Sequence, residues 1–328
     1  MSAQAIMALL DQADTELIVM LCHHNADPDA IGAAFALSSL LKRLRPTMKI
    51  EVSSAEGSSR LSKRVLPALS MKLKKAPNIE GADAIILLDT NTIQQLGHWA
   101  EKLRTFSGPI LSIDHHASHP ETQRLVTLTV EDEKASSTCE VVFRLFCELG
   151  LKLTKMEATA LLLGIAFDTC HFAHANSTTL KIVADVSSAN IDVRKVLSLL
   201  SLPMEESERM ARLKASKRVK FLRIGGWIVV FSHVSTYQAS AARALLSLGA
   251  HLAAVAGQRG GSVSVSLRAS QDFHDSTKIH LGRRLAQPLG EYLNGMGGGH
   301  AVAAGANGTG DAEDALTYCA ELLKKAIS

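Results

Sequence analysis

The stretch PILSIDHHAS, residues 109–118, is an aliphatic run that ends in an acid and two imidazoles, Asp114, His115 and His116. A continuous apolar run is typical of a parallel strand that is buried on both faces of a sheet. Three titratable side chains directly after it are costly to bury unless a partner compensates them. The stretch therefore predicts a buried strand and, at its carboxyl end, a site that holds such a partner.

Three more aliphatic runs precede this one, at 17–23, 48–54 and 83–90. Segments with helical spacing alternate with these runs or follow them, at 29–44, 93–106, 136–150 and 154–169. Strands that alternate with helices in this way predict a doubly wound α/β domain with a mainly parallel sheet. We expect this domain to span residues 1–190.

A second, smaller α/β domain is expected over residues 221–328, joined to the first by a helical connector at 191–220. Its expected strands are 227–234, 251–258 and 262–270, and its expected helices are 238–249, 279–294 and 313–327. The glycine-rich stretch GMGGGH, residues 295–300, lies between the last two helices and is expected to form a loop.

The composition is that of a globular chain, with 328 residues of which 47% are hydrophobic. No run of about 18 consecutive apolar residues occurs, so no membrane span is expected. The N-terminus lacks the basic start of a signal peptide. The five cysteines form no CxxC pair and are expected to be buried thiols. Together these features predict a cytoplasmic protein.

The formal net charge is only +3, but the basic residues are concentrated in two zones, at 41–75 and 211–300. Two basic zones in a nearly neutral chain suit an anionic substrate. The alternative is that both zones are simply solvated surfaces. Aromatic residues make up 4% of the chain, which argues against an extended stacking platform for a long single strand.

Acidic and histidine side chains follow the expected strands at corresponding positions. They are His23, Asp27, Asp29, Asp89, Asp114, His115 and His116, and Asp168 ends a further apolar run. In an open α/β sheet, sites form outside the carboxyl ends of the strands. Any one of these acids alone could instead cap a helix, and any one histidine could be structural.

Carboxylates and imidazoles without thiolates suit Mn²⁺, with Mg²⁺, Co²⁺ or Fe²⁺ as alternatives. Five crowded carboxylates repel one another more than one dication can offset. Two dications that share a carboxylate could offset that repulsion, and such a pair is the arrangement that hydrolyses phosphate esters. The sequence therefore predicts a two-metal site.

The motifs HHNADPDAIGA (23–33), LLDT (87–90), SIDHHAS (112–118) and GIAFDT (164–169) resemble the four motifs of the DHH phosphoesterase family. GMGGGHAVAAG (295–305), with SLRAS (266–270), resembles the nucleotide-binding motif of the DHHA1 domain that often follows. The chain looks most similar to the nanoRNase and phosphoadenosine-phosphate phosphatase branch, which belongs with the RecJ-like proteins.

Two features depart from the family pattern. The first motif reads Asp-Pro-Asp at residues 27–29, where the branch usually has Pro-Asp-Gly-Asp. The basic stretch at 57–75 has no place in the pattern.

The resemblance implies a role for each matching residue. One metal ion would be held by His23, Asp27 and Asp89, and a second by Asp29, Asp89, His115 and Asp168. His116 would meet the scissile phosphate, and Asp114 would orient one of the two imidazoles. The residues alone do not distinguish the role of His115 from that of His116.

In the second domain, the glycines at 297–299 leave backbone N–H groups open, as a phosphate cradle requires, although they could equally form a flexible turn. Arg268 ends an expected strand and can bind a phosphate through two hydrogen bonds. The resemblance implies that Arg268, Gly297, Gly298, Gly299 and His300 bind the nucleotide end of the substrate.

The expected function is metal-dependent hydrolysis of short oligonucleotides or dinucleotides to mononucleotides, as in a nanoRNase. The alternatives within the same chemistry are cleavage of cyclic di-AMP or pApA and a RecJ-like exonuclease activity on single-stranded DNA. A catalytically inactive nucleotide-binding scaffold is the alternative outside enzymes. Family members often form dimers, so a homodimer is a further option that no residue decides.

Overall fold

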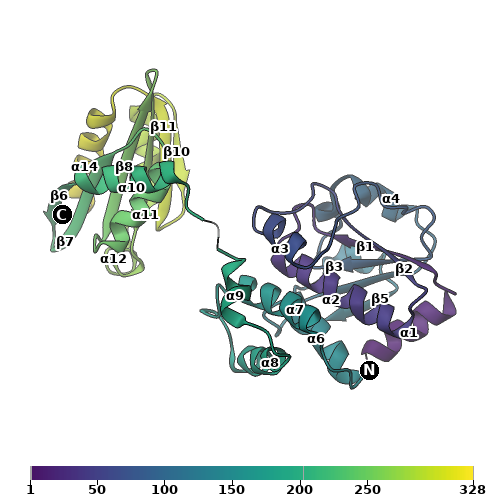
Figure 1. Cartoon of the computed structure of the whole chain (residues 1–328). Coiled ribbons are helices and arrows are strands. Elements are labelled where there is room, and N and C mark those ends of the chain that lie inside the picture. Colours follow the sequence, from purple (N-terminus) through teal and green to yellow (C-terminus); the bar gives the residue numbers. More distant parts are fainter. Residues whose placement is uncertain (1, 202, 328) are drawn as a thin grey trace. The chain divides into compact units, whose positions relative to one another are not determined.

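The computed structural model describes residues 2–201 and 203–327, which form two compact units that divide between residues 202 and 203 (Figure 1). The division lies inside the stretch expected to be a connector. Helix α9 (Val193–Ser198) packs into the core of the first unit through Val196, whereas α10 (Glu206–Lys217) packs in the second through Ala215. The 191–220 stretch is therefore shared between the two units.

The first unit contains a five-stranded parallel sheet with the strand order β2-β1-β3-β4-β5. Its strands are β1 (Leu17–Cys22), β2 (Lys49–Ser54), β3 (Ala84–Leu88), β4 (Ile110–Asp114) and β5 (Leu128–Glu131). The prediction of a parallel sheet with the motif residues after β1, β3 and β4 is confirmed. The short edge strand β5 was not expected, because its sequence LTVE has no aliphatic run.

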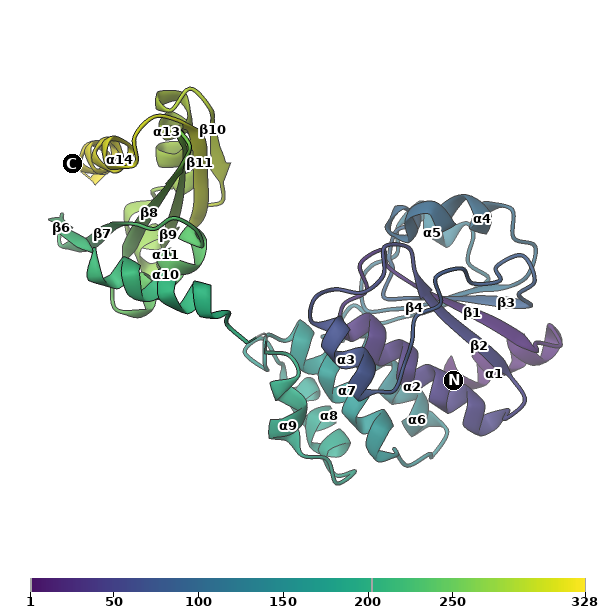
Figure 2. The same ribbon diagram turned by 45° about the horizontal axis from the view of Figure 1, so that its top comes forward.

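Helices cover both faces of this sheet, as the doubly wound fold requires (Figure 2). The main helices are α1 (Ser2–Gln12), α2 (Pro28–Leu44), α6 (Thr138–Glu148), α7 (Lys155–Asp168) and α8 (Ser177–Ser187). Shorter ones are α3 (Ser62–Ala68), η1 (Ile93–Trp99), α4 (Ala100–Arg104) and α5 (Pro120–Gln123).

Side chains alternate along β1, so the strand contributes to a hydrophobic core on each face of the sheet. Ile18, Met20 and Cys22 face the core under α2, α6 and α7, whereas Val19 and Leu21 face the core under η1 and α4. The expected helix at 93–106 is interrupted at Gly97, whose φ of 56° lies in the left-handed region. Gly97 lies inside η1, so the segment forms a kinked η1 followed directly by the short helix α4, in place of one long helix.

Helices α2 and α7 approach each other closely at two glycines. A Cβ atom on Gly32 would lie 2.4 Å from the carbonyl oxygen of Ala160, and one on Gly164 would lie 2.4 Å from a carboxylate oxygen of Asp29. Asp29 lies in the first turn of α2, and Asp168 is the last residue of α7. The glycine contact therefore brings these two acids to the same edge of the sheet.

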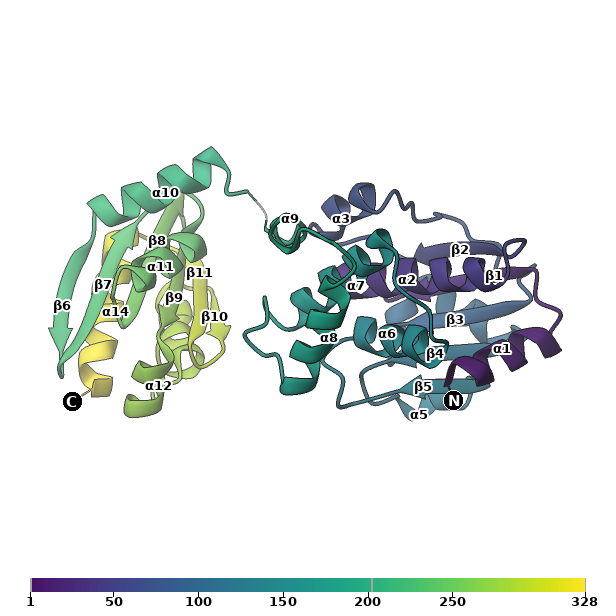
Figure 3. The ribbon, with the colours of Figure 1, turned by 60° about the horizontal axis from the view of Figure 1, so that its bottom comes forward.

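The second unit contains a six-stranded sheet with the order β10-β11-β9-β8-β7-β6, in which only β7 and β8 run parallel (Figure 3). The strands are β6 (Lys220–Ile224), β7 (Trp227–His233), β8 (Leu252–Arg259), β9 (Ser262–Ala269), β10 (Met296–Gly299) and β11 (Ala303–Thr309). Its further helices are α11 (Gln238–Ser247), α12 (Gln271–Thr277), η2 (Gly282–Ala286), α13 (Gln287–Tyr292) and α14 (Ala312–Ile327).

The expectation of a loop at 295–300 is wrong, because Met296–Gly299 forms the edge strand β10. Two of its glycines are required by close packing within the unit. A Cβ atom on Gly297 would lie 1.6 Å from the carbonyl oxygen of Ala286, and Gly299 has a φ of 133°. Around Gly298, in contrast, the space within 4 Å is open.

Among the described residues, no helix combines the length and the apolar character that a membrane span requires.

Replacement of Gly297 by Ala should destabilise the second unit, because the added methyl group has no space beside Ala286. Overpacking of this kind typically costs about 1–3 kcal/mol. Gly298→Ala is the matched control and should leave the melting temperature of the full chain nearly unchanged. Thermal unfolding followed by circular dichroism measures both variants, and equal melting temperatures would contradict this packing.

Candidate metal centre

The parallel register of the first sheet brings the ends of three strands to one level. Cys22 of β1 pairs with Leu88 of β3, and Leu88 pairs with Ile113 of β4. His23, Asp89 and Asp114 are the next residues of these three strands. The side chains that follow each aliphatic run therefore meet at the carboxyl edge of the sheet.

Asp27 uses its two carboxylate oxygens differently. Oδ1 accepts hydrogen bonds from the backbone N–H groups of Asp29 and Ala30, at 2.9 and 3.1 Å, and so caps helix α2. Oδ2 lies 3.6 Å from Nε2 of His23. Pro28 is the first residue of α2, where its fixed φ suits the helix and its missing N–H is not needed. Capping and a ligand role are therefore compatible in Asp27.

Asp29 is fully buried, and the N-terminus of helix α6 holds its carboxylate. The backbone N–H of Thr138 donates to Oδ2 at 2.6 Å, and that of Cys139 donates to Oδ1 at 3.0 Å. A helix N-terminus stabilises an anion through these free N–H groups and the helix dipole. The side chain of Asp29 is thus fixed before any ligand binds.

Asp89 lies at the centre of the cluster and has a backbone φ of 53°, in the left-handed region. Its Oδ1 lies 3.7 Å from Nε2 of His115 and from Nδ1 of His116, and its Oδ2 lies 3.9 Å from Nε2 of His23. The hydroxyl of Thr138 donates a hydrogen bond to Oδ1 at 3.1 Å. A non-glycine residue keeps this conformation only where its surroundings hold it.

His115 presents its Nε2 atom to the acids. Its Nδ1 lies 3.3 Å from the carbonyl oxygen of Ala135, which fixes the tautomer with the proton on Nδ1. Nε2 is buried, has no hydrogen-bond partner among the described residues and lies 3.3 Å from Oδ2 of Asp168. An unpartnered imidazole nitrogen with a free lone pair among carboxylates is what a metal ligand requires.

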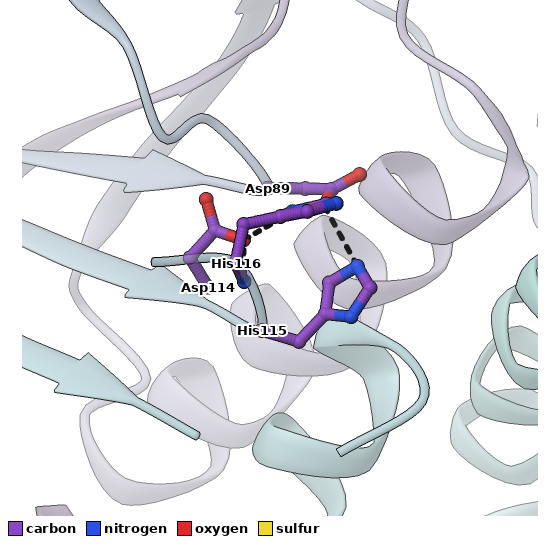
Figure 4. Close-up of side chains that lie close together, drawn as sticks. All are labelled: Asp89, Asp114, His115 and His116. Carbon is purple, nitrogen blue, oxygen red and sulfur yellow. Dashed lines mark hydrogen bonds and ion pairs between the residues drawn. The ribbon is translucent and has the colours of Figure 1, made fainter. Parts of the chain in front are cut away.

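His116 interacts with Asp114 (Figure 4). Asp114 is fully buried, and its Oδ1 accepts hydrogen bonds from the backbone N–H of His116 at 2.9 Å and from its Nδ1 at 2.8 Å. The imidazole that Asp114 orients is therefore that of His116. The side chain of His116 is 52% exposed, whereas that of His115 is 14% exposed. His116 is thus the imidazole that solvent and substrate can reach.

Asp168 completes the cluster from the end of α7, where the helix gives way to a strained turn. Cys170, His171 and Phe172 have φ values of 49°, 56° and 71°, so three consecutive non-glycine residues lie in the left-handed region. Such strain persists only where surrounding structure imposes it, and it is found most often near functional sites.

Potential ligands form three groups, and within each group the ligand atoms lie within 4.8 Å of one another. The groups are His23, Asp27 and Asp89; Asp29, His115 and Asp168; and Asp89, Asp114, His115 and His116. Asp89 belongs to two of these groups. Oxygen and imidazole donors with a shared carboxylate and an unpartnered His115 nitrogen fit a pair of hard or borderline divalent cations.

The comparisons with known proteins agree with this geometry. The model of the DHH family, N-terminal domain, matches residues 17–165. An uncharacterized protein of Methanocaldococcus jannaschii is 33% identical over 301 residues, which cover 92% of this chain and 90% of that protein. The chain belongs to the DHH family of phosphoesterases. The resemblance inferred from the motifs is thereby confirmed.

Two further relatives extend the comparison of this DHH protein. The bifunctional oligoribonuclease and PAP phosphatase NrnA of Bacillus subtilis is 27% identical over 316 residues, which cover 89% of each chain. A crystal structure of an exopolyphosphatase-related protein from Bacteroides fragilis superposes with a TM-score of 0.65 at 20% identity and covers 99% of this chain and 96% of that one. This last likeness supports the fold.

Burial and mutual repulsion raise the pKa values of three carboxyls of the cluster. Burial first, and then the charge of Asp29, raise the pKa of Asp168 to about 11. The pKa of Asp29 is raised by burial and by Asp27, and that of Asp89 by burial and by Asp29. The hydrogen bond to Asp114 raises the pKa of His116. The cluster therefore favours positive charge, supplied either by protons or by cations.

The expected substrate-binding residues of the second unit lie at one end of its sheet. Arg268 on β9 pairs with Ala303 of β11, and its guanidinium donates to the carbonyl oxygens of Leu267 and Ala304 at 2.8 and 3.3 Å. Gly299 pairs with Ala304, and the backbone N–H of His300 donates to the carbonyl of Ala303. Part of the donor capacity of Arg268 is thus already used within the unit.

Thr138 and Cys139, which hydrogen-bond two acids of the cluster, were not identified from the sequence. The pattern Ser137-x-x-Glu140 before an apolar run is a signature of a helix start, and Ser137 indeed caps α6. The pattern does not show which acid such a helix faces. That information resides in the packing of α6 against α2.

Removal of the Thr138 hydroxyl should weaken metal binding, because Asp89 loses the donor that orients its Oδ1. Loss of such an outer contact typically costs about 10–100-fold in metal affinity. Thr138→Val should show this loss in calorimetric titration with Mn²⁺, whereas Thr138→Ser keeps the hydroxyl and should retain most of the affinity. Equal affinities of the Val and Ser variants would contradict a positioning role.

The metal-free DHH protein should become less stable as the pH rises from about 5.5 to 8. Asp29, Asp89 and Asp168 have raised pKa values in the folded state, so the folded state retains protons that the unfolded chain releases above its own carboxyl pKa of about 4. Mn²⁺ should replace these protons and reduce the slope. Melting temperatures in EDTA and in Mn²⁺ test this, and a rise with pH in EDTA would contradict it.

Proposed function

We propose that the protein is a metal-dependent phosphodiesterase that removes mononucleotides from short oligonucleotides. The observation that carries the proposal is the position of Asp89, whose carboxylate oxygens lie 3.9 Å from Nε2 of His23 and 3.7 Å from Nε2 of His115, next to an exposed imidazole. The relationship to an oligoribonuclease and PAP phosphatase over 89% of both chains supports short nucleotide substrates.

The proposed ligand sets are those that the family resemblance implies, and the distances are compatible with them. His23, Asp27 and Asp89 would hold one cation, and Asp29, Asp89, His115 and Asp168 would hold the second. Mn²⁺ suits this donor set best, with Mg²⁺ or Co²⁺ as alternatives. Two such cations would generate a nucleophile from water at neutral pH and neutralise the charge of the phosphate.

His116 would act on the substrate directly. Its pKa is raised chiefly by the hydrogen bond from Nδ1 to Asp114, so the imidazolium form is favoured. Nδ1 is held by Asp114, which leaves Nε2 available to donate a proton to the leaving oxygen or a hydrogen bond to the phosphate. Asp114 would thus orient His116 and favour its protonated form.

In the second unit, Arg268, Gly297, Gly298, Gly299 and His300 would bind the nucleotide end of the substrate. Gly298 is the member with open space around it, and β10 is an edge strand that leaves some N–H groups unpaired. Cleavage of cyclic di-AMP or pApA uses the same chemistry and is a second candidate. A homodimer is compatible with this proposal and is not required by it.

The test is the turnover of labelled RNA and DNA from dinucleotides to pentanucleotides, and of cyclic di-AMP, with Mn²⁺ at equal substrate concentrations. We expect mononucleotide products from the short strands and loss of nearly all activity in Asp89→Asn. Full activity of Asp89→Asn would overturn the mechanism. Preference for cyclic di-AMP would select the second candidate.

The two neighbouring histidines should respond differently to replacement. His115→Ala should reduce the affinity for Mn²⁺, because its Nε2 faces Asp89 and Asp168. His116→Ala should leave Mn²⁺ affinity nearly unchanged and lower kcat by about 10²–10⁴-fold, the usual contribution of a general acid. Calorimetry and steady-state kinetics separate the two effects, and the opposite pattern would exchange the roles.

A further inference from the structure

The segment Gly57–Arg64, which we term the rim segment, begins directly beside the first motif. The backbone N–H of Ala26 donates to the carbonyl of Gly57 at 3.0 Å, and that of Ser59 donates to the carbonyl of Ala26 at 2.9 Å. These contacts form a parallel bridge between Ala26 and Ser58. Ala26 precedes the candidate ligand Asp27. The rim segment therefore adjoins the cluster.

The chain leading into the rim segment is held against the same loop. The hydroxyl of Ser54 donates to the carbonyl of His23 at 2.6 Å, and the backbone N–H of Glu56 donates to the carbonyl of His24 at 2.8 Å. Ser54 is the last residue of β2 and pairs with Cys22 of β1. The rim segment thus leaves the sheet at its carboxyl edge, the edge that carries the site.

The rim segment is basic and starts a stretch without acids. No Asp or Glu occurs from residue 57 to residue 79. Arg60 and Lys63 are exposed, and Ser58 and Ser59 are half-buried beside them. Arg64 is half-buried, and one of its guanidinium nitrogens donates to the carbonyl of Ser201. The rim segment therefore forms a positively charged surface beside the carboxylate cluster.

We propose that the rim segment is a phosphate-binding subsite for a single-stranded oligonucleotide, and that Arg60 and Lys63 contact the phosphates beyond the one being cleaved. The inference rests on the proposed function and specifies its substrate. A dinucleotide without a terminal phosphate has no such further phosphate, so the rim segment favours strands of three or more nucleotides over it.

The side chains of the rim segment indicate electrostatic recognition. It contains no aromatic residue on which a base could stack. Contacts to phosphates neither read the base sequence nor distinguish ribose from deoxyribose strongly. Binding should therefore depend on salt and on strand length more than on sequence, because each neutralised phosphate releases counterions.

A second pair of basic residues provides a matched control. Lys42 and Lys72 line a hollow between α2 and β2, together with Ser38, Phe35 and Met71. Lys42 lies 13 residues after Asp29 on the same helix, so it is about 20 Å from that acid along the helix axis at 1.5 Å per residue. Lys42 and Lys72 also carry two positive charges, but away from the site.

The experiment compares Arg60→Gln/Lys63→Gln with Lys42→Gln/Lys72→Gln in the full chain. Two assays use labelled RNA dinucleotides and pentanucleotides between about 50 and 200 mM salt. Over this range the affinity of proteins that contact phosphates falls measurably. The first measures kcat/KM with Mn²⁺, and the second measures binding by fluorescence anisotropy in EDTA. Melting temperatures show whether each variant is folded, and Lys63→Gln alone replaces the rim variant if it unfolds.

We expect the rim variant to lose affinity and kcat/KM for the pentanucleotide and to retain its kcat/KM for the dinucleotide. Two lost contacts to single-stranded phosphates should lower the slope of log affinity against log salt by about 1.4, or about 7-fold over a fourfold change in salt. The control variant should keep the wild-type slope. If the rim and control variants behave alike, the subsite does not exist.

The two proposals fail separately. If the wild-type protein cleaves dinucleotides and pentanucleotides but the rim variant keeps the full salt slope, only the subsite is overturned. If the wild-type protein cleaves no oligonucleotide, the proposed function is overturned. The anisotropy measurement then still decides whether the rim segment binds single strands.

Discussion

The buried carboxylate of Asp29 is the constraint on which the candidate site depends. It has no access to solvent, and it accepts hydrogen bonds from two backbone N–H groups at the start of α6. These bonds fix α6 relative to α2, and the glycines of α2 and α7 fix α7 relative to Asp29. The positions of Thr138 and Asp168 follow from this arrangement. One acid thus organises three helices around the end of a parallel sheet.

The parallel sheet and the meeting of the motif residues could be predicted from the sequence. Continuous aliphatic runs favour parallel strands that are buried on both faces of a sheet. The last residue of each run marks the end of the strand. His23, Asp89 and Asp114 follow three runs directly and meet at one level. The fold class and the family could be recognised because the motif residues directly follow the aliphatic runs.

The remaining features depend on tertiary packing that a local pattern does not contain. The sequence Met296–Gly299 lacks the side chains that favour a strand, yet it forms β10 by pairing with β11. Gly297 and Gly299 lie where η2 and β11 leave no space for a Cβ atom. Asp114 stands at the end of an aliphatic run, as a metal ligand would, but its carboxylate accepts a hydrogen bond from His116. The roles of adjacent residues are decided by side-chain direction, which only coordinates supply.

Pro28 gives the first motif a property beyond its helix-starting role. Because the φ angle of Pro28 is restricted, the chain between Asp27 and Asp29 has fewer unfolded conformations to lose. The two acids are therefore ordered when the protein folds, with little further loss of backbone entropy when a cation arrives. A glycine in this position would leave more of that entropy loss to the binding step. The Asp-Pro-Asp motif thus makes the placement of these two acids a property of the fold.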